Sequence, residues 1–136
     1  MSKSDHAAAE RSDAEANADL VRRFIGTWAT LDAARLADYF CEDGCYHNMP
    51  LEPVVGLDNI RRFIEGFLTT WTATDWQILH VAAVGNVVFV ERLDRTRTQT
   101  GAVDLPCVGV FEMHAGRIRV WRDYFDMATY TRALQT

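Results

Sequence analysis

Arg92, Asp94 and Asp123 are side chains whose types and positions could support acid/base chemistry. They lie in segments with the composition of β-strands, in which alternate residues share one face. Arg92 and Asp94 therefore face the same way as the two valines before them, and Asp123 faces the same way as Trp121 and Phe125. An ionisable group on an apolar strand face is costly to bury unless it is paired. Because burial and charge coupling separate the pKa values of two carboxyl groups, the pattern predicts a buried acid/base site.

Tyr46 and Asn48 form a second polar pair, two residues apart on what reads as a short strand. A phenol and an amide at this spacing can hold one water molecule between them. If their face meets the face of Asp123, that water has a base beside it. An exposed salt bridge on a strand edge is the alternative interpretation of Arg92 and Asp94. The position of Asp123 between two aromatic residues, and the Tyr46–Asn48 pair, favour the buried site.

Other chemistries find little support in the chain. Cys41, Cys45 and His47 are close enough in sequence to suggest a metal site, but a second pair of ligands is lacking. Cys45 and His47 would also face away from Tyr46 and Asn48, so free buried thiols are favoured and no metal is expected. All serines lie among the first twelve residues, which argues against a Ser-His-Asp hydrolase. There is no glycine-rich phosphate loop.

The composition is that of one globular domain. The chain has 136 residues, of which 49% are hydrophobic, enough for a core. A net charge of -5 argues against a nucleic-acid-binding surface. No apolar run approaches the roughly 20 residues of a membrane span, and the polar N-terminus does not read as a secretory signal. Three cysteines, an odd number, argue against a disulfide framework, so a cytoplasmic location is expected.

The first half of the chain reads as helical, with one short strand. Residues 1–17 are Ala-rich and charged and predict a flexible arm outside the domain. Apolar residues at helical spacing predict an amphipathic helix over 20–31 and another over 60–68, and a short helix is expected over 36–40. A strand is expected over 45–49, before two prolines break the chain into a loop.

The second half reads as a run of antiparallel strands. Strands are predicted over 76–84, 87–98, 105–114 and 117–125, separated by glycine-containing turns, and a short helix over 129–134 ends the chain. Helices followed by a run of strands predict an α+β fold for a single domain of residues 18–136. A curved sheet packed on helices leaves a concave pocket, which is a common ligand site.

Four motifs resemble the limonene-1,2-epoxide hydrolase family: Tyr46-His47-Asn48-Met49-Pro50-Leu51, Glu91-Arg92-Leu93-Asp94, Gly109-Val110-Phe111 and Trp121-Arg122-Asp123-Tyr124-Phe125-Asp126. The similarity runs from about residue 20 to the end, in the same order. It implies a cone-shaped α+β fold, shared with ketosteroid isomerase, scytalone dehydratase and nuclear transport factor. In this fold a curved, mixed, largely antiparallel sheet wraps around N-terminal helices and encloses a deep apolar pocket. Members of the family are cofactor-free and usually dimeric, so a homodimer is expected.

The resemblance also implies a role for each polar residue of the site. Asp94 would be the acid and Asp123 the base, Arg92 would bridge them, and Tyr46 and Asn48 would hold the water. His47 departs from the family motif, which has glutamine there. By strand periodicity His47 lies on the other face, so it should not affect the chemistry. Carried over by position, the apolar lining of the family's pocket corresponds to Ile25, Trp28, Phe67, Trp71, Trp76, Leu105, Cys107 and Phe125.

The implied reaction is the hydrolysis of a small apolar or cyclic, terpenoid-like epoxide to a vicinal diol. Water and the epoxide would be the only reactants, and the reaction would be one general acid/base step without a covalent intermediate. Two alternatives remain open. One is a dehydratase or isomerase of the same fold, which needs no dedicated water site. The other is a non-catalytic carrier of small ligands, against which stands the cost of burying three ionisable groups.

Overall fold

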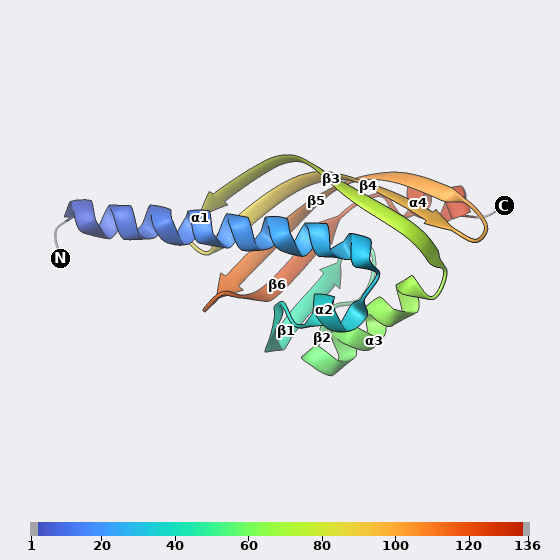
Figure 1. Ribbon diagram of the computed structural model, residues 1–136, viewed down its shortest axis with the longest axis horizontal. Helices are drawn as coiled ribbons and strands as arrows, with labels where there is room; N and C mark the ends of the chain where they lie inside the picture. The colour runs from blue at the N-terminus through green and yellow to red at the C-terminus, as the bar shows by residue number, and fades with distance from the viewer. Residues whose placement is uncertain (1–2, 135–136) are drawn as a thin grey trace.

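The computed structural model describes residues 3–134, with side chains described from Asp13 onward. Four α-helices, one 3₁₀ turn and six strands follow one another along these residues (Figure 1). In chain order they are α1 (Lys3–Thr27), η1 (Trp28–Thr30), α2 (Ala33–Ala37), β1 (Phe40–Asn48), β2 (Val54–Val55), α3 (Leu57–Leu68), β3 (Trp71–Val84), β4 (Val87–Thr98), β5 (Ala102–His114), β6 (Arg117–Tyr124) and α4 (Met127–Leu134).

All six strands form one mixed sheet in the order β2-β1-β6-β5-β4-β3. Pairing is antiparallel except between β1 and β6, which run parallel. That parallel pairing joins the first long strand to the last one and sets Tyr46 opposite Trp121 and Asn48 opposite Asp123. The predicted α+β fold with a largely antiparallel sheet is confirmed.

The core lies between the helices and one face of the sheet. Figure 1 shows the long strands β3, β4 and β5 bending over α1, with α2 and α3 at the β1 end of the sheet. Phe24 of α1 is fully buried and makes edge contacts with Phe40, Phe111 and Trp121, whose rings come from three different strands. Edge-to-face packing of this kind stabilises a core beyond the burial of apolar area.

Local signals explain where the shorter helices begin. The side chain of Asp32 accepts a hydrogen bond from the backbone N–H of Arg35 at 3.1 Å and so caps α2. Asp58 lies in the first turn of α3, where a negative charge suits the helix dipole. Ile60 and Ile64, one turn apart on α3, are fully buried, as the apolar spacing predicts.

The structure differs from the sequence prediction at the N-terminus. Helix α1 begins at Lys3 and so includes most of the segment expected to be a flexible arm. Alanine and glutamate favour a helix by themselves, without the apolar stripe that the prediction relied on. The amide of Asn17 also donates to the carbonyl of Gly85 at 3.4 Å, which ties the end of that segment to the β3–β4 hairpin. The domain boundary at residue 18 stays a prediction.

Three strands, β1, β3 and β5, begin earlier than predicted, the last at Ala102 rather than at residue 105. Residues 36–40 were expected to be helical, but α2 ends at Ala37 and β1 begins at Phe40. The register of β1 against β6 shifts between Phe40 and Cys45, and this irregularity hides the alternation in the sequence. Strand β3 begins at Trp71 rather than near residue 76. Among the described residues, every helix is too short or too polar to cross a membrane.

Candidate active site

Arg92 lies at the centre of a buried ion-paired triad. Its Nε donates to Oδ1 of Asp94 at 3.0 Å, and its Nη2 donates to Oδ2 of the same carboxyl at 2.8 Å. Toward Asp123, Nη1 donates to Oδ1 at 2.9 Å and Nη2 to Oδ2 at 2.7 Å. One planar guanidinium thus makes a two-bond contact with each of two carboxyl groups, which a lysine could not do.

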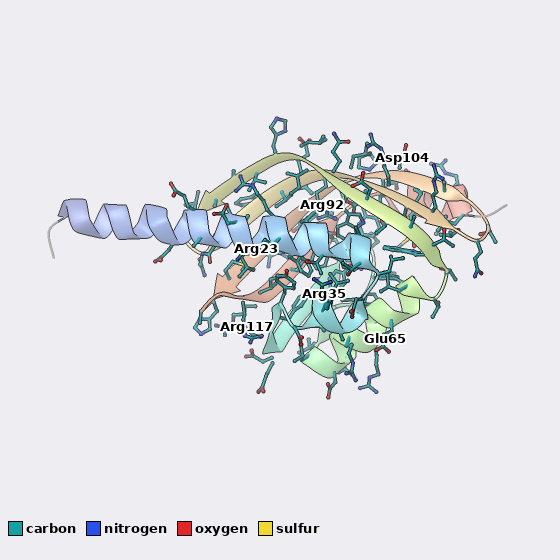
Figure 2. The ribbon with its side chains drawn as sticks, viewed as in Figure 1. Arg23, Arg35, Glu65, Arg92, Asp104 and Arg117 are labelled. Carbon is teal, nitrogen blue, oxygen red and sulfur yellow. The ribbon has the colours of Figure 1, made fainter. Side chains whose placement is uncertain are left out.

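Strand alternation points all three side chains inward. On β4 every second residue is buried, and Arg92 and Asp94 continue the row that Val88 and Val90 begin. On β6 the buried residues are Ile118, Trp121 and Asp123. Figure 2 shows Arg92 in the middle of the molecule, whereas labelled charged residues such as Glu65 and Asp104 lie at its edges. The buried site is therefore confirmed over an exposed salt bridge as the environment of Arg92 and Asp94.

Burial is nearly complete, and it sets the electrostatics of the triad. The relative exposure is 0% for Arg92, 6% for Asp94 and 4% for Asp123. Burial raises the pKa of Asp94 above its ordinary value, although the charge of Arg92 opposes the rise. Burial lowers the pKa of Arg92, but the two carboxylates outweigh it and hold that pKa well above its ordinary value. Arg92 is therefore a permanent cation, and Asp94 holds a proton more readily than an exposed carboxyl group does.

Three further side chains complete the surroundings of the triad. The Trp121 indole Nε1 donates to Oδ1 of Asp123 at 2.8 Å. The Cys107 thiol donates to Oδ2 of Asp94 at 3.3 Å. The Trp76 ring covers Arg92, with its centroid 4.6 Å from the guanidinium carbon, a favourable cation–π distance. Each carboxyl group thus has donors in addition to Arg92, which a buried charge requires.

Tyr46 and Asn48 join the triad from β1. Asn48 is the register partner of Asp123, and Tyr46 that of Trp121, whose ring it stacks on at 4.2 Å between centroids. Both side chains are buried. Burial raises the pKa of Tyr46 well above its ordinary value, and the charge of Asp123 adds to the rise, so Tyr46 is a neutral phenol. All five polar residues predicted for the site therefore lie together.

A pocket of about 60 Å³ opens beside the polar residues. Tyr46, Asn48 and Asp123 supply its polar part, and apolar side chains supply the rest. Of the predicted lining residues, four contribute to it: Phe67, Trp71, Leu105 and Phe125. The polar residues contribute atoms at one end of an otherwise apolar cavity, which is the usual construction of a small-molecule site.

The other four predicted lining residues lie elsewhere. Ile25 of α1 and Trp28 of η1 are each 1% exposed and belong to the core. The Trp28 ring stacks on that of Trp76 at 4.2 Å, and neither residue is among those that line the pocket. Trp76 covers Arg92, and Cys107 contacts Asp94.

Three lining residues had no counterpart in the sequence prediction: Leu51, Met127 and Tyr130. Met127 and Tyr130 are three residues apart on α4 and so share a face, a signal that helical spacing could have provided. The indole Nε1 of Trp71 donates to the hydroxyl of Tyr130 at 3.1 Å and so ties α4 to the start of β3 at the pocket.

The described residues contain one group whose ligand atoms could surround a cation, formed by Asp94, Cys107 and Asp123, with these atoms within 4.8 Å of one another. The guanidinium of Arg92 already bonds both carboxyl groups of that set. A metal ion would have to displace a buried, fully paired cation, so this geometry fits an ion-paired triad better than a metal centre. His47 contacts the Leu51 carbonyl at 2.9 Å, away from the triad.

Comparison with known proteins relates this geometry to one family. The model of the limonene-1,2-epoxide hydrolase (LEH) catalytic domain matches residues 15–135.

Solved structures share the fold more widely. An LEH-like epoxide hydrolase from M. tuberculosis is 24% identical, with a TM-score of 0.78 over 89% of this chain and 90% of that one. A phenazine biosynthesis-related protein from Pseudomonas aeruginosa is 20% identical, with a TM-score of 0.79 over 93% and 89%. A protein described as a SnoaL-like polyketide cyclase, from Shewanella putrefaciens CN-32, is 16% identical, with a TM-score of 0.78 over 87% and 95%. At these identities the likenesses establish the fold alone.

Arg92→Met should lower the free energy of unfolding by about 3–5 kcal/mol at neutral pH, because it leaves two buried carboxylates without their cation. Without Arg92, which lowers the pKa of Asp94, that pKa should rise further. The folded variant then binds more protons than the unfolded chain, so the loss should grow as the pH rises from about 5 to 8. Urea denaturation at both pH values measures this difference.

The matched control is Arg61→Met. Arg61 pairs with Glu65 at 3.6 Å, with the two side chains 49% and 54% exposed. Removing so exposed an ion pair should change the stability by less than about 1 kcal/mol. Equal losses for the two variants would show that the buried pairing of Arg92 does not support the fold.

Proposed function

This chain belongs to the limonene-1,2-epoxide hydrolase family, and from that premise we propose that it adds water to a small apolar or cyclic, terpenoid-like epoxide to give a vicinal diol. One observation carries the proposal: Arg92 bonds Asp94 and Asp123 at the same time, and Asp123 lines an apolar pocket together with Tyr46 and Asn48. Two carboxyl groups in different protonation states are what a paired acid and base require.

The base half of the reaction belongs to Asp123. Ionised and held by Arg92 and Trp121, it takes a proton from a water molecule that Tyr46 and Asn48 orient. The water oxygen attacks one epoxide carbon from the side opposite the carbon–oxygen bond, which inverts that carbon. The register of Asn48 with Asp123 on adjacent strands supports this arrangement. General-base assistance of this kind contributes roughly 10²–10⁴-fold.

The acid half belongs to Asp94. As the carbon–oxygen bond breaks, protonated Asp94 donates its proton to the epoxide oxygen, which becomes the second hydroxyl of the diol. The raised pKa of Asp94, caused by burial, supports this role because an acid must hold its proton until the ring opens. After the reaction Asp123 carries a proton and Asp94 lacks one. The cycle closes when Asp123 releases its proton and Asp94 takes one up, which leaves the total number of protons unchanged, while Arg92 stays charged throughout.

The fold alone does not select this reaction, because the same architecture occurs in a protein described as a polyketide cyclase. The Tyr46–Asn48 pair favours a hydrolase, since a dehydratase or isomerase has no need of a dedicated water site. A carrier of apolar ligands would gain nothing from burying Arg92, Asp94 and Asp123.

We also propose that the protein is a homodimer formed through the outer face of the sheet. Phe89, Val108 and Tyr124 on that face are exposed by 44%, 38% and 45%. Val108 and Tyr124 are register partners on adjacent strands, so they form part of one apolar surface. A second copy would cover this surface. Analytical ultracentrifugation should give the mass of two chains, and the mass of a single chain would contradict the proposal.

Asp94→Asn and Asp123→Asn should each lower kcat for epoxide hydrolysis by at least about 100-fold, because each removes one of two proton transfers. Asp104→Asn is the control, since Asp104 is exposed on β5 and outside the triad. Turnover of cyclohexene oxide and limonene oxide, with chiral chromatography of the diols, measures the effect. Either triad variant keeping more than about a tenth of kcat would contradict its assigned role.

Hydrolysis in ¹⁸O-labelled water should place one labelled oxygen in the diol during the first turnover, because water itself attacks the epoxide. A covalent aspartyl ester would instead transfer an unlabelled carboxyl oxygen to the first product. Mass spectrometry of the diol under single-turnover conditions, with enzyme in excess, separates the two mechanisms. Unlabelled diol would mean that a carboxylate is the nucleophile.

Phe67→Ala and Trp71→Ala should admit bulkier cyclic epoxides and change the enantiomeric excess of the diol, since both side chains line a pocket of about 60 Å³. Ile25→Ala is the contrasting variant. Because Ile25 is core, this change should lower stability by about 2–5 kcal/mol and leave substrate preference unchanged. Rates on a small and a bulky epoxide, with urea denaturation, test both. If Ile25→Ala alone shifts the preference, the pocket lies elsewhere.

A further inference from the structure

Arg92 and Asp123 pair across an intervening strand. Arg92 belongs to β4 and Asp123 to β6, and β5 lies between those strands. Gly109 occupies β5 at this crossing, opposite Val90 on one side and opposite Asp123 on the other. The Arg92 side chain must therefore pass over Gly109 to reach Asp123.

A side chain at residue 109 would meet both partners of that ion pair. A Cβ built on Gly109 lies 2.8 Å from Nη1 of Arg92 and 2.9 Å from Oδ1 of Asp123. These are the two atoms that form one hydrogen bond of the pair, at 2.9 Å. The same Cβ lies 3.0 Å from Cε1 of Phe111. Carbon atoms do not approach oxygen or nitrogen so closely without repulsion, so something would have to shift.

Neither partner can shift without losing bonds. The guanidinium of Arg92 is fully buried and makes four hydrogen bonds. Oδ1 of Asp123 also accepts from the Trp121 indole at 2.8 Å. Both atoms that would contact the new carbon are therefore already held.

The backbone does not explain the glycine. Gly109 lies inside a regular stretch of β5 and does not have the positive φ that marks Gly56, Gly85 and Gly116. The other inward residues of β5 all carry side chains: Val103, Leu105, Cys107, Phe111 and Met113. The missing side chain at residue 109 coincides with the ion pair, whose two atoms lie nearest to the built Cβ, and with the edge of the Phe111 ring.

We propose that Gly109 is a positioning residue for the base Asp123. Because Gly109 has no side chain, it leaves the space in which Arg92 bonds Asp123. The residue acts through Arg92 and Asp123 and does not touch substrate, and its effect on turnover rests on the proposed hydrolase function. With alanine at this position, the Nη1–Oδ1 bond is lost and the Asp123 carboxylate moves from its place. The bonds from Arg92 to Asp94 use Nε and Nη2 and remain.

The test compares Gly109→Ala with Gly26→Ala. Gly26 is an exposed glycine of α1 with nothing within 4 Å of a built Cβ, so it controls for the change in backbone freedom. Three quantities are measured for each full-length variant: kcat and KM on cyclohexene oxide, the thermal unfolding midpoint, and the ¹H–¹⁵N resonances of the indole groups. Trp121→Phe assigns the Trp121 resonance.

Gly109→Ala should move the Trp121 indole resonance, because that N–H donates to the displaced oxygen of Asp123. The Trp71 resonance should stay in place, since its partner is Tyr130. We expect kcat to fall at least about 10-fold with KM changed less than about 3-fold, because a base misplaced by about 1 Å loses rate rather than binding. Gly26→Ala should leave kcat, KM and the indole resonances unchanged and should raise only the unfolding midpoint, because alanine favours a helix over glycine.

A Trp121 resonance that does not move overturns the proposal, whatever the activity. A shifted resonance with kcat retained overturns the positioning role. If the wild-type protein hydrolyses no epoxide, the proposed function fails, while the resonance still decides whether Gly109 makes room for the ion pair. If Gly109→Ala does not fold, Gly109→Ala/Asp123→Ala is compared with Asp123→Ala by urea denaturation. The Gly109→Ala change should then have little effect, because Oδ1 of Asp123 is absent and Arg92 no longer has to reach it. A double variant that fails to fold where Asp123→Ala folds also overturns the proposal.

Discussion

The buried pairing of Arg92 with two carboxyl groups is the constraint on which the rest of the site depends. An isolated charge in this position would be unstable, and a single carboxylate would leave half of the guanidinium fork without partners. Two carboxyl groups satisfy the fork, but they carry one more negative charge than Arg92 can balance. Burial relieves this imbalance by raising the pKa of Asp94. The burial that makes the pairing with Arg92 necessary is therefore also the cause of the raised pKa of Asp94.

The surroundings follow from this constraint. Trp121 serves the core and the site at once, since its ring packs on Phe24 and Tyr46 while its N–H donates to Asp123. Trp76 in turn covers the cation of Arg92 with an aromatic face. Aromatic side chains suit these positions because they exclude water and still offer a polar edge or a π-face to a charge. The site is thus continuous with the hydrophobic core and does not rest on a separate loop.

The same sheet and helices occur in proteins with other descriptions, so chemistry in this fold depends on which side chains face inward. In this chain the five polar residues of the site lie on three strands. Strands β1 and β6 are adjacent, and β5 separates β6 from β4. The apolar pocket wall comes from other elements, chiefly α3, the start of β3 and α4. Because different elements supply the polar groups and the wall, substitutions in the wall can change the accepted ligand while the triad keeps its geometry.

Much of the site could be predicted from the sequence because strand alternation is a local property. The inward orientation of Arg92, Asp94 and Asp123 follows from a period of two residues and the apolar neighbours of each. The resemblance to a known family added the roles. Periodicity could not show that β1 pairs in parallel with β6, because the two strands are more than seventy residues apart in the sequence. It also could not show that α1 begins as early as Lys3.

The pocket wall is the part of the site that depends most on how distant elements pack. In the sequence Ile25 and Trp28 look as suitable for a pocket as Phe67 and Trp71, because all four are large apolar residues on amphipathic segments. Packing of α1 and η1 against the sheet buries the first two in the core, whereas the turn from α3 into β3 leaves the other two at the cavity. Local spacing of apolar residues decides which face of a helix or strand is apolar, and this could be read from the sequence. Which of those faces meets protein and which meets a cavity depends on how distant elements pack together, and only the fold decided that.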